Sequence, residues 1–324
     1  MPPVWSAGTN CRLMAYHFTM PSSKFPLLHL GTSSFTAKGW EKAFYPAQTR
    51  TRDFLSYYAT QFDTLELDAT FYRTPAVSTV QNWHDKTPSH FRFALKMPQE
   101  ITHERVLLET DSLTTEFLQA TEPLGEKLAV ILLQFPYFNK NAFGGPSDFL
   151  IRLKPFVEKL PTQPRFALEI RNRHWLVPAF FDLLRKHNIA FALIDHPWMP
   201  RPLEYLAQAD PVTADFSYIR WLGDRMAIEE RTQVWDKTIV DRSGDLQEWV
   251  DACRNFIKRK IRLFAFANNH YGGYAPETLR LFEDLLEARC GDLAEHTAEE
   301  QPKRIVQTPA TLRAREQTLF DWDD

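Results

Sequence analysis

The chain has 324 residues, of which 44% are hydrophobic and 14% aromatic, enough apolar material for one large core or two modest ones. Its formal net charge of −3 shows no overall basic excess of the kind that favours nucleic-acid binding. The net charge does not exclude local basic patches. No apolar run approaches about 18 residues, so the sequence predicts no membrane partner. Three distant cysteines in no metal-like spacing indicate reduced thiols and a cytoplasmic protein.

Short apolar runs recur along the chain, and most are followed by a turn and a segment with helical spacing. The predicted strands cover 27–30, 64–67, 91–95, 129–133, 166–170, 189–194, 216–221 and 261–267. The predicted helices cover 51–60, 75–85, 112–122, 147–159, 178–187, 245–258 and 276–288, with a shorter one at 203–208.

Eight strand–helix units in about 260 residues predict an α/β fold, a closed (β/α)8 barrel of the TIM type. We expect a single domain at 27–290, an N-terminal arm at 1–26 and a C-terminal tail at 291–324. An open doubly wound sheet is the rival architecture. The glycine count of 11 and the absence of GxGxxG after the first strand weaken its dinucleotide-binding version.

Strand alternation predicts which side chains face the inside of the barrel. In the fifth strand the bulky apolar residues share one face, which leaves Glu169 and Arg171 on the other. The second strand places Glu66 and Asp68 inward in the same way, and the third places Lys96 inward. These polar groups stand at the carboxyl ends of the strands, where barrels of this type assemble their active sites.

The predicted catalytic residues are Glu66, Glu169 and Lys96. The two carboxylates are candidates for general acid and base, or they simply neutralise nearby cations. Lys96 could bind an anion or form a Schiff base, and we favour the anion. Arg171 and Arg220 carry forked donors that suit a carboxylate or phosphate ligand, or they only bridge the two glutamates.

Further ligand contacts are predicted from the other strand ends and the loops that follow them. Aromatic rings can stack on a sugar or base, histidines can transfer protons, and the glycine-containing turn at 268–274 could bind phosphate before a helix. The predicted residues are Tyr72, His103, His174, Trp175, Asp195, Asn268 and Asn269.

A divalent metal site is the alternative use of this cluster. Glu66, Glu169, Asp195 and a histidine would be its ligands. Lys96 and Arg171 would compete with a cation there, so we expect no metal. The sequence names no cofactor.

With these residues in view, the chain resembles the YecE-like family, domain of unknown function 72. The resemblance covers about residues 27–289 and rests on GTSSFTAKGW, LELDATFYRTP, FRFALKMPQEITH, LLQFP, FALEIRNRHW, SYIRW and FAFANNHYGGYAPET. It implies a TIM-type barrel but neither a reaction nor catalytic residues. Two departures stand out: Asp68 where Asn is expected, and Trp221-Leu222-Gly223 where the family has a His-Gly pair.

The end of the sequence, REQTLFDWDD, places an apolar group among acidic residues. Its Gln317, Leu319 and Phe320 are similar to peptides that dock on bacterial sliding clamps, with one residue fewer between Gln and Leu. This tail is therefore a candidate docking segment for a partner protein. The alternative is that Leu319, Phe320 and Trp322 pack on the chain's own barrel.

Taken together, the residues predict an enzyme or binder for a small anionic or sugar-like metabolite, with acid/base or hydrolytic chemistry favoured. A nucleic-acid-associated protein, whose mouth holds a nucleotide or strand and whose tail recruits a partner, is the alternative. A sensor or scaffold that binds a ligand without chemistry is a third reading.

Overall fold

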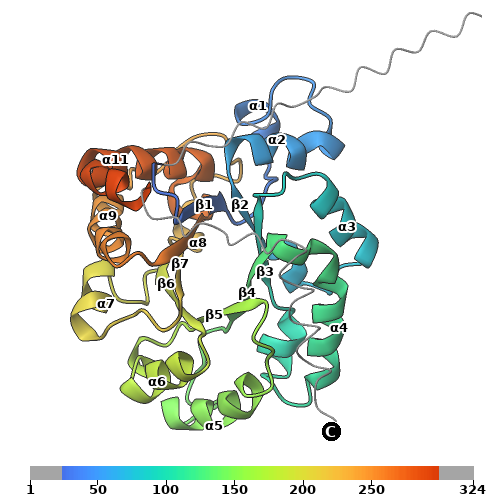
Figure 1. Ribbon diagram of the computed structural model, residues 1–324, viewed down its shortest axis with the longest axis vertical. Helices are drawn as coiled ribbons and strands as arrows, with labels where there is room; N and C mark the ends of the chain where they lie inside the picture. The colour runs from blue at the N-terminus through green and yellow to red at the C-terminus, as the bar shows by residue number, and fades with distance from the viewer. Residues whose placement is uncertain (1–23, 299–324) are drawn as a thin grey trace, which may run out of the picture.

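The computed structural model describes residues 24–298, which form a nearly closed barrel of parallel strands surrounded by helices (Figure 1). This confirms the predicted fold class. The strands are β1 (Leu28–Thr32), β2 (Thr64–Leu67), β3 (Arg92–Lys96), β4 (Leu128–Gln134), β5 (Arg165–Glu169), β6 (Ala190–Asp195), β7 (Phe216–Trp221) and β8 (Arg262–Ala267).

Most of the helices lie where the apolar spacing predicts them. They are α1 (Trp40–Ala43), α2 (Phe54–Gln61), α3 (Val77–Asp85), α4 (Asp111–Thr121), α5 (Pro146–Val157), α6 (Pro178–Lys186), α7 (Pro202–Gln208), α8 (Arg225–Glu229), α9 (Ser243–Lys258), α10 (Asn269–Gly272) and α11 (Ala275–Ala298). The sequence did not predict α1, α8 and α10, because four or five residues are too few to show a period. Helix α11 continues past the predicted domain boundary at 290.

The ladder of strands runs from β1 through β8 and back down to β2, and β1 and β2 meet at a seam. At this seam Gly31 lies so close to β2 that a Cβ atom would stand 2.2 Å from the carbonyl oxygen of Thr64. The hydroxyl of Tyr58, on α2, bridges the two strands. It accepts from the Thr32 amide at 2.8 Å and donates to the Thr64 carbonyl at 3.1 Å.

Strand alternation divides the core into two layers, as the sequence predicts. The outward faces pack against the helices in one large apolar cluster. The inward faces form a separate cluster that fills the barrel: Ala94, Ala129, Val130, Leu132, Ala167, Ala190, Ala192, Phe216, Tyr218, Phe264 and Phe266. The barrel interior is therefore packed with side chains, and its two ends are separate surfaces.

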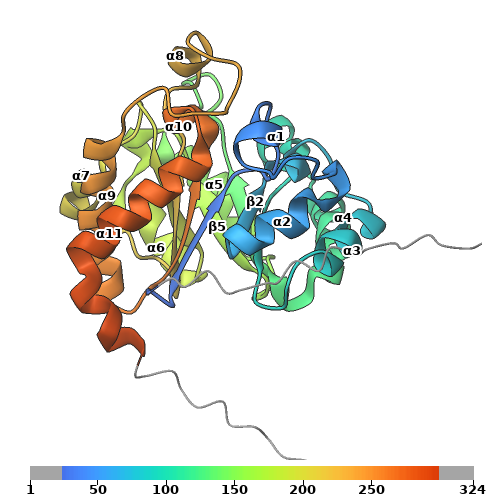
Figure 2. The same ribbon diagram turned by 90° about the horizontal axis from the view of Figure 1, so that it is seen from above.

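The two ends of the barrel are easy to follow in Figure 2, where α8 and α10 stand at one end and α11 runs back toward the other. Residues 1–23 of the predicted N-terminal arm, and the tail residues Gln317, Leu319 and Phe320, lie outside the described residues. Cys253 and Cys290 are free, buried thiols. Within 24–298, none of the helices combines the length and apolar character that crossing a membrane requires.

Candidate active site

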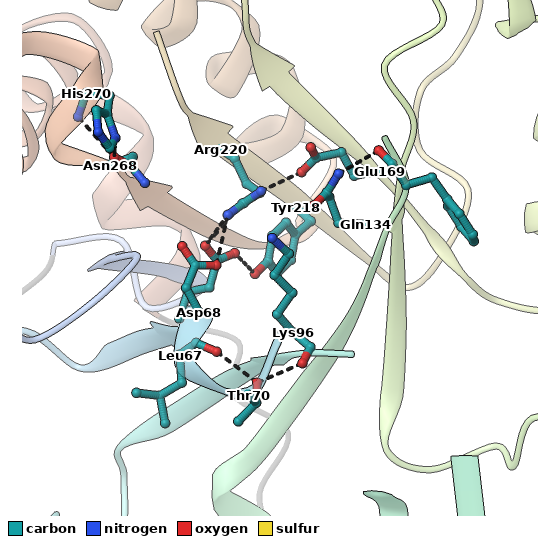
Figure 3. Close-up of polar contacts among 12 residues, drawn as sticks. Leu67, Asp68, Thr70, Lys96, Gln134, Glu169, Tyr218, Arg220, Asn268 and His270 are labelled. Carbon is teal, nitrogen blue, oxygen red and sulfur yellow. Dashed lines mark hydrogen bonds and ion pairs between the residues drawn. The ribbon is translucent and has the colours of Figure 1, made fainter. Parts of the chain in front are cut away.

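The carboxyl ends of the strands hold a cluster centred on Arg220, which β7 points into the barrel mouth (Figure 3). Its Nε and Nη2 donate to Glu66 Oε1 at 3.1 and 2.7 Å, and its Nη1 donates to Glu169 Oε2 at 2.7 Å. A longer contact of 3.4 Å joins Nη2 to Asp68 Oδ1. Arg220 is only 2% exposed and both glutamates are fully buried, so one arginine links groups from β2, β5 and β7.

Tyr218 belongs to the same cluster, although the sequence did not predict it. Its hydroxyl donates to Glu66 Oε2 at 2.5 Å, so both oxygens of Glu66 have partners. Burial and the neighbouring Glu66 raise the pKa of Tyr218 well above its usual value, which keeps the phenol a hydrogen-bond donor. Alternation could have identified Tyr218, because it lies two residues before Arg220 on the same face of β7.

Glu169 is held between two arginines. Its second oxygen, Oε1, accepts from Arg171 Nε at 3.1 Å. Burial alone would raise its pKa, but Arg220 and Arg171 lower the pKa of Glu169 to about 2. Glu169 is therefore ionised at neutral pH, which suits a positioning group better than a proton donor.

Asp68 and Lys96 face each other across the same mouth and have displaced pKa values. Burial, followed by the charge of Glu66, raises the pKa of Asp68 above its usual value, although a third of its side chain is exposed. Burial lowers the pKa of Lys96, against the opposing effect of Asp68. The Lys96 ammonium lies 3.8 Å from the ring centre of Phe71 and has no hydrogen bond or ion pair with the described residues.

Two histidines stand beside these cations. Burial and the charges of Lys96 and Arg171 lower the pKa of His103 to about 4, and its ring meets Phe71 edge-on at 4.8 Å. Burial and Arg171 lower the pKa of His196 to about 4 as well. Both rings are neutral at pH 7, so each can accept as well as donate a hydrogen bond.

Asp195 does not reach the mouth, contrary to the expectation for it. Its oxygens accept from Arg201 Nη1 at 3.1 Å, Trp249 Nε1 at 2.7 Å and the Tyr271 hydroxyl at 2.9 Å. The reason is alternation: Asp195 lies in register with Trp221, which faces the helices, while the inward position belongs to the next residue, His196. Asp195 therefore ties the strand end to α9 and α10.

His174 and Trp175 also lie apart from the cluster. They belong to a single turn of 3-10 helix after β5, where strand alternation no longer applies. Trp175 is 6% exposed and stacks on Phe149 and Phe138 at 5.1 and 5.8 Å, so it packs in an aromatic core. His174 is exposed and makes no hydrogen bond within residues 24–298.

The remaining predicted contacts belong to loops. Tyr72 is 72% exposed, and its ring meets the neighbouring Phe71 ring at 5.4 Å. Asn268 caps α10 by accepting from the His270 amide at 3.0 Å, and Asn269 accepts from the Ala275 amide at 3.0 Å. The His270 and Ala275 amides thus donate to side chains of the same turn instead of to a ligand, which leaves the phosphate expectation without support from the geometry.

The metal alternative loses its ligand set, because Asp195 is bound elsewhere and Arg220 occupies the space between Glu66 and Glu169. Among the residues that the structure describes, no group of three or more His, Cys, Asp or Glu side chains gathers in a way that could hold a metal ion.

Comparison with known proteins finds relatives that share the description UPF0759. UPF0759 protein YunF from Bacillus subtilis is 32% identical over 283 residues, which cover 79% of this chain and 95% of that protein. UPF0759 protein YecE from Escherichia coli is 34% identical over 127 residues, and this match spans only 43% of its length.

Solved structures with the same fold include a DUF72 family protein from Thermotoga maritima. It is 26% identical with a TM-score of 0.63, and the match covers 80% of this chain and 99% of that one. A DUF72 family protein from Enterococcus faecalis, at 20% identity and a TM-score of 0.60, supports the fold alone. The family described as "Protein of unknown function DUF72" matches residues 29–304. The chain therefore belongs to the DUF72 family.

Proposed function

We propose that this protein is an enzyme that binds a small metabolite through a carboxylate or phosphate group and carries out acid/base chemistry at the barrel mouth. The observation that carries the proposal is Lys96, a residue only 9% exposed whose ammonium has neither a hydrogen bond nor an ion pair among residues 24–298. A largely buried ammonium whose nearest partner is only the Phe71 ring is costly, and an anionic ligand would reduce that cost.

The anion would lie between Lys96 and Arg171. Arg171 uses only Nε for Glu169, so its terminal nitrogens are open to a ligand, and its side chain is 27% exposed. Guanidinium and ammonium groups together suit a carboxylate or phosphate. The Ser33 hydroxyl adds a further donor. It is buried without a hydrogen-bond partner among the described residues and follows β1 in the inward alternation that begins with His29.

Asp68 is the group best suited to transfer a proton. Its raised pKa favours the protonated carboxyl, and the aspartate formed after donation lies 3.4 Å from Arg220 Nη2, which would stabilise the new charge. Glu169 stays ionised and positions Arg220 and Arg171. The geometry therefore supports Asp68 rather than Glu169 as the proton donor, with Lys96 stabilising negative charge on the ligand.

An aromatic rim supports an organic ligand with a ring, such as a sugar. Tyr137 and Trp198 are 56% and 55% exposed, and their rings meet at 5.7 Å. Trp198 also contacts His196 at 5.0 Å, which places the pair over the side of the mouth near Arg171. Exposed aromatic faces of this kind commonly stack on sugars or bases.

The test is a ligand-observed NMR screen of small carboxylates, sugar phosphates and uncharged sugars against the full chain. We expect anionic compounds to bind, and Lys96→Gln and Arg171→Gln each to weaken binding at least about tenfold. Arg225→Gln is the matched control, since Arg225 is an exposed arginine on α8. Binding of anions that is equal in all four proteins would refute the proposed anion position.

The catalytic part has its own test once a bound ligand is turned over. Asp68→Asn should abolish turnover while the affinity stays within about threefold, because the amide keeps the shape but has no acid proton to give. A Schiff base at Lys96 is checked with sodium cyanoborohydride and mass spectrometry of the intact chain. We expect no adduct; a reduced adduct at Lys96 would replace anion binding with covalent catalysis.

A further inference from the structure

A cavity of about 750 Å³ opens at the end of the barrel opposite the mouth. Residues at or next to the first positions of several strands line it, and alternation turns them inward: His29 on β1, Arg92 on β3, Arg165 on β5, and Arg262 and Phe264 on β8. Strands of five or six residues separate these groups from the mouth by roughly 15 Å, and the inward apolar cluster fills the space between the two ends.

Only one of the three arginines of this cavity is paired with a carboxylate among the described residues. Arg165 donates from Nε and Nη2 to Asp215 at 3.2 and 2.9 Å. Arg92 donates only from Nη1, to the backbone oxygens of Ser89 and Phe91. Arg262 has no hydrogen bond or ion pair among residues 24–298, although it is half-buried.

The direction of the pKa shift of Arg262 agrees with its lack of a carboxylate partner. Burial, then the like charges of Arg165 and Arg92, lower the pKa of its guanidinium despite the opposing effect of Asp215. The neighbouring His29 is held by Asp63 at 2.6 Å and stacks on Phe264 at 4.8 Å. The cavity therefore combines an aromatic ring with two arginines, Arg92 and Arg262, that no carboxylate among the described residues pairs with.

We propose that this cavity is an anion-binding site, separate from the mouth, for a ligand that carries a phosphate or pyrophosphate group. Arg92 and Arg262 supply the unused forked donors, which match phosphate oxygens. The exposed Glu122 and Glu126 also line the cavity and favour a compact anion seated on the arginine side rather than a long polyanion across the whole opening. This end of a TIM-type barrel does not carry the chemistry, so the site binds an effector or a stabilising ligand.

The test is calorimetric titration of the full chain with sodium pyrophosphate, against sodium chloride of equal ionic strength. The background is the double variant Lys96→Gln/Arg171→Gln, which removes the proposed anion position of the mouth. We expect saturable one-to-one binding to remain in this background. Adding Arg262→Gln, or separately Arg92→Gln, should weaken it at least about tenfold, while adding Arg225→Gln should leave it unchanged.

Two results would overturn the site. One is the loss of all pyrophosphate binding in the mouth double variant, which would leave the mouth proposal intact. The other is unchanged affinity in both cavity variants. Circular dichroism and thermal melts show whether each variant is folded, and Arg92→Gln keeps the test decisive if Arg262→Gln does not fold.

Discussion

The two ends of the barrel use arginine in opposite ways. At the mouth, Arg220 is buried and bonded to two glutamates, with Asp68 nearby. At the other end, Arg262 sits beside two further arginines with no ion pair of its own among the described residues. Both residues lie on inward faces of adjacent strands, so the difference arises from their neighbours rather than from their place in the sheet.

This contrast separates charges that hold the structure from charges that are available to a ligand. Arg220 directs all three of its nitrogens at carboxylates, so it mainly fixes the groups around it. Lys96, Arg171 and Arg262 have donors to spare, and all three are at least partly buried. On this basis we propose the open cations as the ligand positions, with the Arg220 cluster orienting those at the mouth.

The largest expected effect comes from removing the central arginine. Arg220→Leu leaves Glu66 and Glu169 buried without their main partner, so the free energy of unfolding should fall by about 3–5 kcal/mol. Urea denaturation measures it, with the exposed Arg225→Leu as the control. A loss below about 1 kcal/mol would mean that Arg220 is not the frame of the site.

The second-largest effect is expected from acid, which should lower the free energy of unfolding by protonating Glu169. The folded pKa of Glu169, about 2, lies below that of an unfolded glutamate, so its stabilising effect is present above about pH 4.5 and is lost as the pH falls toward 2. We expect a loss on the order of 3 kcal/mol between these values, from urea midpoints at each pH. In Glu169→Gln this part of the pH dependence should be absent; an identical acid profile would contradict the shift.

A smaller loss is expected from Tyr218→Phe. This variant removes the hydrogen bond to Glu66 Oε2 and leaves that buried oxygen without its donor, which costs about 1–3 kcal/mol. Tyr72→Phe, at an exposed hydroxyl, is the matched control and should change nothing measurable. Equal denaturation curves for Tyr218→Phe and the wild type would show that the contact contributes nothing to stability.

The smallest change in stability is expected at the end of the barrel opposite the mouth, where a substitution should be neutral or slightly stabilising. Arg262→Gln removes a charge that its surroundings disfavour, so stability should stay within about 0.5 kcal/mol or rise slightly at low salt. Melting temperatures at low and high salt measure it without added phosphate. A loss as large as that of Arg220→Leu would show that Arg262 has a structural partner and would remove the contrast.

The sequence was informative where alternation within a strand was followed. Period-two alternation places Glu66, Lys96 and Glu169 inward, and the structure joins the two glutamates through Arg220. It also turns Arg262 inward, but the amino ends of barrel strands are not where chemistry is expected, so the cavity there was not predicted.

Prediction failed where alternation was not applied or where the strand had ended. Asp195 is the last residue of β6 and faces the helices, while Trp175 lies in a helical turn whose direction no strand period describes. The pKa displacements of Asp68 and Lys96 depend on burial and on distances between segments far apart in the chain. Those quantities exist only in the folded molecule.

The most direct test is a crystal structure of the full chain, purified in low-salt buffer and soaked with the tightest anion from the NMR screen. The account predicts electron density for its carboxylate or phosphate between Lys96 Nζ and the terminal nitrogens of Arg171, with Arg220 still bonded to Glu66 and Glu169. A Lys96 ammonium paired directly with Asp68, and an anion bound elsewhere or absent from the mouth, would contradict it.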